Sequence, residues 1–348
     1  MTRFRPLTSR LVSRLLGRSI ADGATRAVTI APPSDVPNPP AISLPDERDR
    51  ILGHHPLSVP ETNWSWLDDA TIHQGATRAH LLRDIVIADG TLLSATAYAA
   101  IRSQKRRMRV PSGLPAIAEA TFCSTFVTER YFAHFLMDGL SSELLARDQQ
   151  WRALMLAGTE YGHEAGYREA AGLPGERVAL ARVDRLWLLE DCEVNANRTA
   201  RLNLLRDTVR GDATGRSRNV FISRGTLGVG RVMGNEAEVV EALSKREFDI
   251  LFPEQTDPAD IIERLRSARI VVAVEGSAIA HAIISAPRGA GVMVIQPPRS
   301  LNMCYRIYAA AVGLTFGYTV GEPTSEETFS QPIDRLNRAI DLLDGALA

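Results

Sequence analysis

The C-terminal part of the chain alternates between two kinds of segment, and this alternation constrains the fold most. From Asn219 onward, short runs of β-branched and apolar residues take turns with longer segments of helical periodicity. Such alternation predicts a parallel, doubly wound sheet with helices on both faces. The expected strands are 219–223, 248–252, 270–274, 292–295 and 314–319, and the expected helices are 235–245, 258–268, 278–285, 302–312 and 332–346.

The stretch Ile270–Ile295 shows the pattern most clearly. It opens with a continuous apolar strand, of the kind that is buried on both faces of a parallel sheet. Gly276 then lets a ligand approach the backbone, and Ser277 is a natural helix N-cap. Free N–H groups at a helix start favour an anion such as a diphosphate. His281, in the following apolar helix, is more often a core histidine than a ligand.

Ligands of doubly wound sheets bind beyond the carboxyl ends of the strands. Arg224, Glu254 and Glu275 follow three expected strands there. The Gly-rich loop 223–236 is flanked by Arg224 and Arg231, so anion binding by two guanidiniums and a flexible surface loop are both open. Its glycine spacing matches neither a dinucleotide fingerprint nor a P-loop. The last two residues of this stretch, which begin the next expected helix, also have structural interpretations: a helix N-cap for Asn235 and a dipole-compensating first-turn acid for Glu236.

Composition excludes several classes of protein. A length of 348 residues suggests about two domains. Hydrophobic residues make up 45% of the chain, charged residues 23%, and the net charge is −1, which argues against binding of nucleic acid by bulk positive charge. The three cysteines lie far apart and fit neither a disulfide framework nor a zinc cluster. We therefore expect a soluble protein of the reducing cytoplasm, with no membrane span.

The first sixty residues are unlike the rest. The first twenty hold five arginines and no acid, with Leu7, Leu11 and Leu15 at helical spacing. A basic amphipathic helix on an anionic membrane surface and a frayed terminus are equally good interpretations. Residues 31–60 contain eight prolines, which predicts an extended arm or linker rather than a domain.

The middle of the chain predicts a second α/β domain of irregular order. Two runs of strand character, 81–88 and 91–97, flank Asp89-Gly90, a strong hairpin signal. A helix apolar on much of its circumference lies within 125–145, and further strands are expected within 151–158 and 185–191. The basic cluster 102–109 is most simply a solvated surface.

His134 and Asp138 lie four residues apart on one face of the buried helix. A carboxylate and an imidazole so placed can share a hydrogen bond, and a base near neutral pH activates a hydroxyl nucleophile. A satisfied structural pair is the alternative. No spacing in the sequence fits a zinc site, an acidic metal cluster or a G-x-S-x-G elbow, so we expect neither a metal nor a cofactor.

Taken together, the ordered motifs resemble glycosyltransferase family 61, which includes bacterial capsular-polysaccharide biosynthesis proteins. The family's H-x-x-x-D helix is His134-Phe-Leu-Met-Asp138 here, followed by Gly and Leu140. A strand ending in Ser-Arg corresponds to NVFISR with Arg224, and then come Arg231, Asn235 and Glu236. The family's H-G-A-G-L-T-N corresponds to EGSAIAH, Glu275 to His281, and the resemblance covers roughly residues 76–322.

The resemblance implies a GT-B fold, with two Rossmann-like domains and a cleft between them. It implies the following organisation: a basic helix and arm at 1–60, an acceptor-side domain at 61–215, a nucleotide-sugar domain at 216–330, and a last helix, 331–348, that packs back on the first domain. It also implies an inverting, metal-independent transfer from a nucleotide sugar to a glycan acceptor. Asp138 would be the base and His134 its partner. Donor binding would fall to Arg224, Arg231, Asn235, Glu236, Glu275, Gly276, Ser277 and His281.

Two departures from the family pattern concern the donor. Glu275 replaces the family's His and His281 replaces its Asn, so either Glu275 accepts hydrogen bonds from ribose hydroxyls or His281 supplies the basic group. A nucleotide-sugar binding protein that has lost transfer and a dinucleotide-dependent oxidoreductase are the rival functions. We expect the protein to act in surface polysaccharide synthesis at or near the inner membrane. The sequence leaves the choice between monomer and homodimer open.

Overall fold

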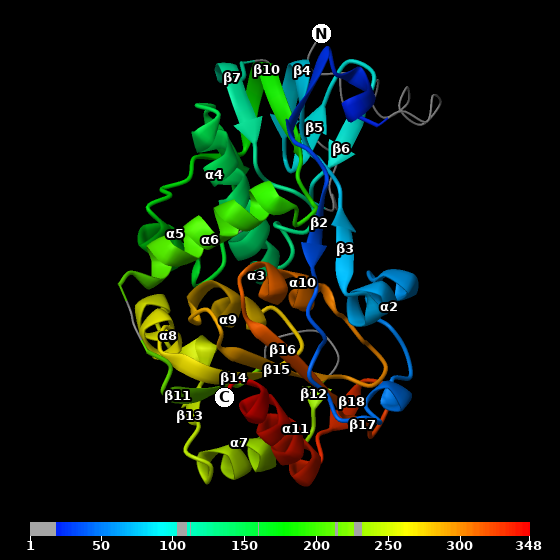
Figure 1. The fold of residues 1–348 in the computed structure, drawn as a ribbon. Helices are drawn as coiled ribbons and strands as arrows, with labels where there is room; N and C mark the ends of the chain where they lie inside the picture. Colours follow the sequence, from blue (N-terminus) through cyan, green and yellow to red (C-terminus); the bar gives the residue numbers. More distant parts are fainter. Residues whose placement is uncertain (1–18, 103–109, 112, 159, 213–214, 226–231) are drawn as a thin grey trace. The chain divides into compact units, whose positions relative to one another are not determined.

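The computed structural model describes residues 19–102, 110–111, 113–158, 160–212, 215–225 and 232–348. It is a mixed α/β protein, as predicted, and it divides into two compact units (Figure 1). The first unit is Met1–Ser34 with Gly75–Arg201, and the second is Asp35–Gln74 with Leu202–Ala348. The predicted boundaries at residues 61 and 216 therefore differ from these units, because each unit is built from two separate stretches of the chain.

The second unit contains the predicted parallel sheet. Its strands lie in the order β13-β11-β14-β15-β16, and every neighbouring pair is parallel. Each predicted strand is found, with ends within two residues of those expected. The bounds are β11 Arg218–Ile222, β13 Asp249–Leu251, β14 Ala268–Val274, β15 Gly291–Gln296 and β16 Thr315–Val320.

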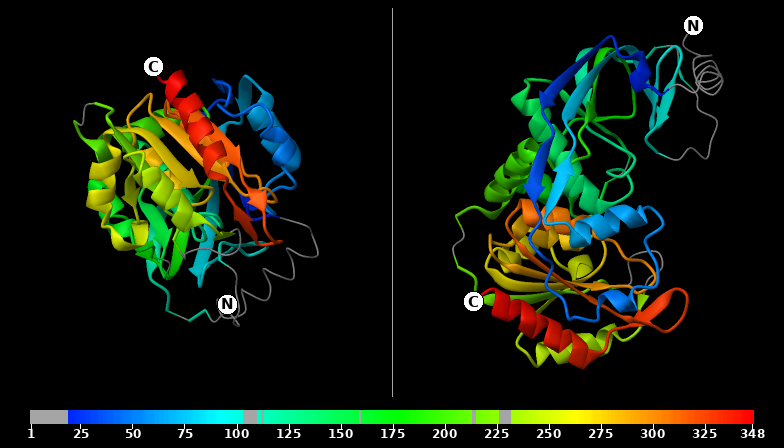
Figure 2. Two further views of the ribbon diagram at one scale, coloured as in Figure 1. Left: turned by 90° about the horizontal axis from the view of Figure 1, so that it is seen from below. Right: turned by 45° about the vertical axis from the view of Figure 1, so that its right-hand side comes forward.

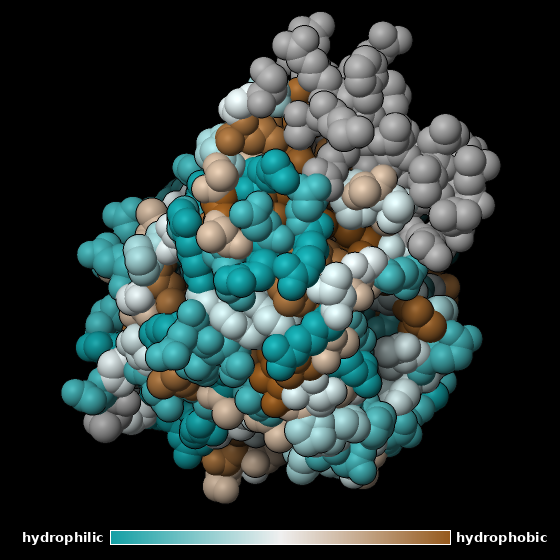
Figure 3. All heavy atoms as spheres, turned by 90° about the horizontal axis from the view of Figure 1, so that it is seen from above, coloured by the Kyte–Doolittle hydropathy of each residue, from teal (hydrophilic) through white to brown (hydrophobic). Residues whose placement is uncertain are grey.

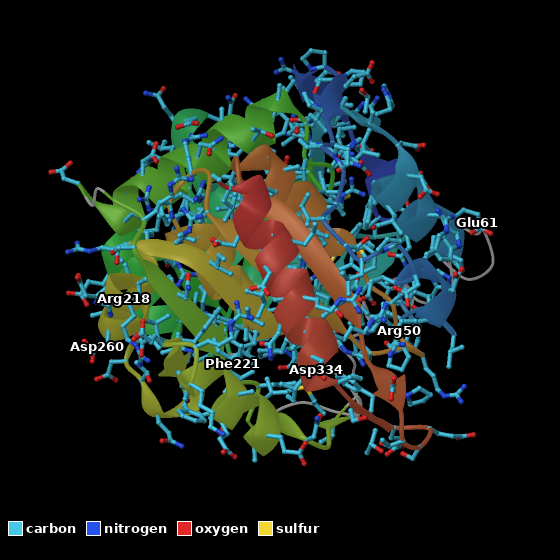
Figure 4. All side chains as sticks on the ribbon, turned by 60° about the horizontal axis from the view of Figure 1, so that its bottom comes forward. Arg50, Glu61, Arg218, Phe221, Asp260 and Asp334 are labelled. Atoms are coloured by element: carbon cyan, nitrogen blue, oxygen red, sulfur yellow. The ribbon has the colours of Figure 1, made fainter. Side chains whose placement is uncertain are left out.

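Helices cover both faces of this sheet, with α7 and α11 on one face and α8, α9 and α10 on the other (Figure 2). Phe221 of β11 is fully buried in the core, whereas Glu61 and Asp260 are exposed at the rim (Figure 4). A small sheet of β12, β18 and β17 lies beside them. The bounds are α7 Glu236–Ser244, α8 Pro258–Leu265, α9 Ile279–Ser285, α10 Cys304–Ala311, α11 Ile333–Ala346, β12 Val232–Met233, β17 Glu322–Pro323, β18 Thr328–Ser330 and a 3-10 turn, η5, Pro253–Gln255.

The last helix, α11, packs within the second unit. Its buried residues Leu336, Ala339, Ile340 and Leu343 recur at helical spacing and join the core formed with β14 and β15. The sequence predicts that this helix packs back on the N-terminal domain; what the structure shows is its apolar stripe buried against the sheet of its own unit.

The Pro-rich arm is extended, as predicted, but it is an integral part of the second unit rather than a linker. The Ile42 amide donates to Phe316 O (2.9 Å) and Ile42 O accepts from the Tyr318 amide (3.0 Å), so the arm continues the sheet beyond β16. Further along, Glu47 is completely buried. The arm's elements are β2 Ser34–Pro37, a 3-10 turn, η3, Arg48–Arg50, α2 Pro60–Asp68 and β3 Thr71–Gln74, with β2 paired to β3.

We expect Glu47→Ala to destabilise the protein by about 3 kcal/mol, because it removes a buried acceptor from three donors. The carboxylate accepts from Thr319 Oγ1 (2.9 Å), the Val320 amide (2.6 Å) and Arg335 Nε (2.9 Å). Urea denaturation gives the free energy of unfolding. Asp46→Ala is the matched control, since exposed Asp46 contacts the same Arg335 (2.6 Å), and it should cost far less. Equal losses would contradict the anchoring role of Glu47.

The first unit contains a mixed sheet in the order β6-β5-β4-β10-β7-β8-β9, with β1 paired to β4. The β10, β7, β8 and β9 strands are parallel neighbours, whereas β4 pairs antiparallel with β1, β5 and β10. The expectation of a second Rossmann-like domain is therefore wrong for the half built on β4. The bounds are β1 Arg26–Ala31, β4 Thr77–Ala88, β5 Thr91–Leu93, β6 Tyr98–Ala100, β7 Ala116–Phe122, β8 Ala153–Leu156, β9 Arg177–Val178 and β10 Leu180–Glu190.

The predicted hairpin is confirmed, because β4 and β5 are joined by Asp89 and Gly90 with φ of 43° and 75°. Both angles are positive, as a two-residue type I′ turn requires. The helical elements of this unit are a 3-10 turn, η2, Ala21–Gly23, α3 Phe132–His134, a π-helical turn, η4, Phe135–Gly139, α4 Leu140–Asp148, α5 Glu164–Ala171 and the start of α6 Ala196–Arg210, which belongs to the second unit from Leu202 onward.

Hydrophilic residues cover most of the described face seen from above, and hydrophobic residues appear there in separate groups (Figure 3). Across the described ranges, no helix combines the length and the apolar character that a membrane crossing requires. The basic N-terminal segment lies outside the described residues, so the prediction of a membrane-surface helix there stays a prediction. The same holds for most of the basic cluster 102–109.

Candidate functional site

The predicted pair of His134 and Asp138 is hydrogen-bonded. His134 ends α3 and Asp138 lies in the π-helical turn η4, with His134 Nδ1 2.6 Å from Asp138 Oδ2. The two side chains keep 24% and 14% of their surface exposed. The turn is held by apolar residues at its other positions, since Phe135, Leu136 and Met137 are buried. Single π-turns within helices are rare and occur frequently at functional sites.

A buried arginine, Arg198, holds the same carboxylate. Its guanidinium donates to Asp138 Oδ1 and to the Asp191 carbonyl, and its side chain is completely buried. Asn195 Oδ1 accepts from the Arg198 amide (3.1 Å) and so caps the start of α6. Both oxygens of Asp138 are therefore engaged, one by His134 and one by Arg198.

A second buried ion pair, between Arg201 and Asp191, lies next to this group. Arg201 donates to both oxygens of Asp191, at 2.8 and 2.9 Å, and also to Ser141 O (2.7 Å). Thr77 Oγ1 donates to Asp191 Oδ1 (2.9 Å). Buried charges are tolerated when they are paired and hydrogen-bonded in this way.

The arrangement lies at the carboxyl ends of two adjacent parallel strands. Asp191 directly follows β10, and the loop after β7 leads into α3 and its His134. Ligand sites of open α/β sheets lie at such ends. Sequence reasoning missed Asp191, Arg198 and Arg201 because α6 was not recognised. The signal was present, since Asn195 is an N-cap residue and Leu202, Leu205 and Val209 recur at helical spacing.

The second unit places Arg224 and Glu275 at the ends of β11 and β14, which are neighbouring parallel strands. The order in which strands are added to the sheet reverses here, because β13 lies on one side of β11 and β14 lies on the other. The Arg224 Nη1 donates to the Glu275 carbonyl (3.4 Å). This is the switch point at which doubly wound sheets bind their ligands.

Asn235 and Glu236 have structural partners. Glu236 Oε1 accepts from Ser223 Oγ (2.8 Å) and from the Arg224 amide (2.8 Å), which fixes the turn after β11. Asn235 stands at the N-cap of α7, as expected, but its side chain exchanges two 2.9 Å hydrogen bonds with the Gln331 backbone instead of capping the helix. Arg231 lies outside the described residues.

The turn after β14 differs in detail from the prediction. Helix α9 begins at Ile279 with Ala278 as its N-cap, so the expected N-cap role of Ser277 is wrong. The Ser277 carbonyl instead accepts from the Ala280 amide (3.2 Å) in a tight turn. Glu275 is buried, and its Oε1 accepts from Asn302 Nδ2 (3.0 Å). His281 is 2% exposed, which is the position of a core histidine.

We expect Gly276→Ala to destabilise the protein by about 1–3 kcal/mol, because residues with a side chain rarely adopt the Gly276 φ of +149°. A Cβ there would meet no atom within 4 Å, so backbone strain alone is tested. Gly345→Ala in α11 is the control, also free of contacts, and it should stabilise by up to about 1 kcal/mol. Thermal unfolding of both variants checks the opposite signs, and shifts of the same sign would contradict the strain at Gly276.

Metal binding and the Cys123 thiol are two further candidate sources of reactivity in the described part of the chain. Within the described ranges, no three His, Cys, Asp or Glu side chains come together as a metal site. Burial raises the pKa of the Cys123 thiol well above its usual value, and the Glu143 carboxylate raises it further. A thiol with a raised pKa stays protonated at neutral pH, so Cys123 is a poor nucleophile.

Most of the residues described above lie within a match to a known protein family. The family model described as "Glycosyltransferase 61" matches residues 132–293, from the first residue of α3 into β15. The predicted resemblance to glycosyltransferase family 61 is confirmed. The family 61 match contains His134, Asp138 and Arg198 as well as Arg224 and Glu275, and it supports a glycosyltransferase.

The remaining comparisons are distant. A flavo di-iron protein mutant from Thermotoga maritima is 12% identical, with a TM-score of 0.28, and the match covers 69% of this chain and 56% of that one. The dodecameric iron-containing heptosyltransferase TibC, solved with ADP-D-beta-D-heptose, is 11% identical, with a TM-score of 0.36, over 79% of this chain and 94% of that one. This chain therefore spans little more than half the length of the flavo di-iron protein. No curated protein matches the sequence.

Proposed function

We propose that this protein transfers a sugar from a nucleotide-sugar donor to a glycan acceptor in surface or capsular polysaccharide synthesis, with inversion and without a metal. The observation that carries the proposal is the group of His134, Asp138 and Arg198 inside the family 61 match. A hydrogen-bonded imidazole beside a fixed carboxylate suits the deprotonation of a hydroxyl. The GT-B arrangement expected from the sequence belongs to the same proposal.

In this proposal His134 is the base, and Asp138 orients it, which reverses the roles expected from the sequence. Both Asp138 oxygens are engaged, and the His134 Nδ1 faces one of them. Among the described residues, His134 Nε2 has no hydrogen-bond partner. It takes the proton of the acceptor hydroxyl as that oxygen bonds to the anomeric carbon. The bond from this carbon to the diphosphate breaks, and its electron pair leaves with the diphosphate.

The second unit would bind the donor. Arg224 and the backbone N–H groups around Gly276 and Ser277 would neutralise charge that builds on the diphosphate. Such preorganised donors are each worth about 3 kcal/mol of barrier. Glu275 would hold this turn through Asn302, since a carboxylate facing the diphosphate would repel it. Arg231 completes the proposed set. Glu236 would fix the turn after β11 and Asn235 would hold the start of α7, whereas His281 is buried in α9.

Thermal stabilisation by a panel of nucleotide sugars tests the proposal, because a ligand that binds only the folded form raises Tm. We expect one donor to stabilise the protein and to be consumed with a glycan acceptor in the presence of EDTA, giving a product of inverted anomeric configuration by NMR. Stabilisation by NAD alone would contradict it. Donor binding without transfer to any glycan would favour the binding-protein alternative, for which Glu275 in place of the family's His is the specific observation.

A further inference from the structure

The loop between β7 and α3 is built as a rigid support beside His134. Ser124 Oγ donates to Glu129 Oε1 (2.7 Å) and accepts from the Leu156 amide (2.9 Å). The Thr125 amide donates to Thr128 Oγ1 (2.7 Å), and Tyr161 donates its hydroxyl hydrogen to Thr128 O (2.8 Å). Ser124, Thr128 and Leu156 are buried, and these hydrogen bonds within the protein fix the loop without a ligand.

This support presents an arginine held between two aromatic rings. The Arg130 guanidinium carbon lies 5.5 Å from the ring centre of Phe126 and 5.5 Å from that of Tyr131. The Tyr131 ring in turn lies 6.0 Å from the His134 ring, edge to face. Phe126 is 42% exposed and Arg130 is exposed. Phe126, Arg130, Tyr131 and the proposed base His134 are therefore linked by successive side-chain contacts.

The charge of Arg130 is available to a ligand. No acidic side chain of the described ranges forms an ion pair with Arg130. The side chain of the nearest acid in sequence, Glu129, is 4% exposed and is paired with Arg102 (2.7 Å). Contact with two rings restricts the guanidinium before a ligand binds, which lowers the entropy lost on binding. A guanidinium held in this way suits two-point recognition of a carboxylate or phosphate.

We propose that Phe126, Arg130 and Tyr131 form the acceptor subsite and that the acceptor carries an anionic group. The group is a carboxylate, as in a uronic acid, or a phosphate ester, and both bring the oxygen pair that the guanidinium fork recognises. The sugar ring packs against the exposed Phe126 and the half-buried Tyr131, and its hydroxyl reaches His134. This inference rests on the proposed function and assigns the chemical class of its acceptor.

Saturation-transfer NMR with the full chain and three probes tests it: methyl glucuronide, glucose 6-phosphate and methyl glucoside. We expect an anionic probe to bind about tenfold or more tightly than the neutral one, the gain of a charge-assisted hydrogen bond. The stronger of the two anionic probes identifies the source of the group. Arg130→Gln should abolish the preference and Arg130→Lys should keep part of it. Equal affinity for all probes, or binding of none, would overturn the proposal.

Arg152→Gln is the matched control, because Arg152 is also an exposed arginine of the same unit but is paired with Glu176 (2.6 Å). It should keep the full preference for anionic probes, and a loss there would also overturn the assignment to Arg130.

The two proposals fail separately. Sugar transfer without any preference for anionic acceptors would refute the subsite alone, whereas Arg130-dependent binding without transfer would refute only the proposed function.

Discussion

Asp138→Asn will lower kcat by about three to four orders of magnitude, the loss seen when an orienting aspartate is replaced in a comparable hydrogen-bonded group. An asparagine can still accept from Arg198, but its NH₂ group cannot accept from His134 Nδ1. The imidazole then adopts the wrong tautomer and loses the charge that stabilises its protonated form. The donor Kd, measured by calorimetry, should stay within about threefold, because an interaction made only in the transition state leaves ground-state binding unchanged.

Glu190→Gln is the control for this variant. Glu190 also pairs with a histidine, His80, at 3.0 Å in the same unit, and its pKa is lowered mainly by that hydrogen bond. We place this pair outside the catalytic group, so kcat should be unchanged. An Asp138→Asn enzyme that keeps a tenth or more of the wild-type kcat would show that Asp138 is only a structural partner of His134.

Arg198→Met will lower kcat by about 100-fold, since the loss of one preorganised electrostatic partner typically costs this much. The buried guanidinium fixes Asp138, and without it the carboxylate is free to turn away from His134. The same variant should lose about 3–5 kcal/mol of stability, because removal of one partner leaves a buried charge unpaired. Steady-state kinetics below the unfolding temperature and urea denaturation measure the two effects.

Arg201→Met separates catalysis from stability. Arg201 lies one turn further along α6, is equally buried and also pairs with a carboxylate, that of Asp191. The Arg201→Met variant should lose as much free energy of unfolding as Arg198→Met, but the kcat of its folded form should stay within about threefold of wild type. Arg198→Lys, which keeps the charge but not the two-point contact, should recover part of kcat. Equal losses of kcat in the Arg198 and Arg201 variants would reduce both residues to a structural role.

The second unit could be predicted from the sequence nearly element by element. Its strands are continuous apolar runs separated by amphipathic helices, so each local signal agrees with the final fold. The sequence also predicted that Arg224 and Glu275 lie at the same edge of the sheet, because parallel strands have their carboxyl ends at one edge. The N-cap at Ala278, one residue beyond the expected Ser277, could not be predicted, since helix ends vary by one or two residues with the local turn.

The first unit and the arm depend on contacts between distant parts of the sequence. Strands β4 and β10 are about a hundred residues apart, and an alternating pattern does not say which strand pairs with which. Ile42 and Glu47 are isolated among prolines, and their burial depends on a sheet edge formed some 270 residues later. His134 and Asp138 were found because helical spacing is local. Arg198 was missed because it reaches Asp138 from another helix.

A double-mutant cycle on kcat between His134 and Asp138 tests the central claim most directly. Residues that act as one unit are not additive, so removing the second after the first costs little. We predict that His134→Ala combined with Asp138→Asn has the same kcat, within about threefold, as His134→Ala alone. If the two losses multiply, the imidazole and the carboxylate act independently, and the account of His134 as a base oriented by Asp138 is wrong.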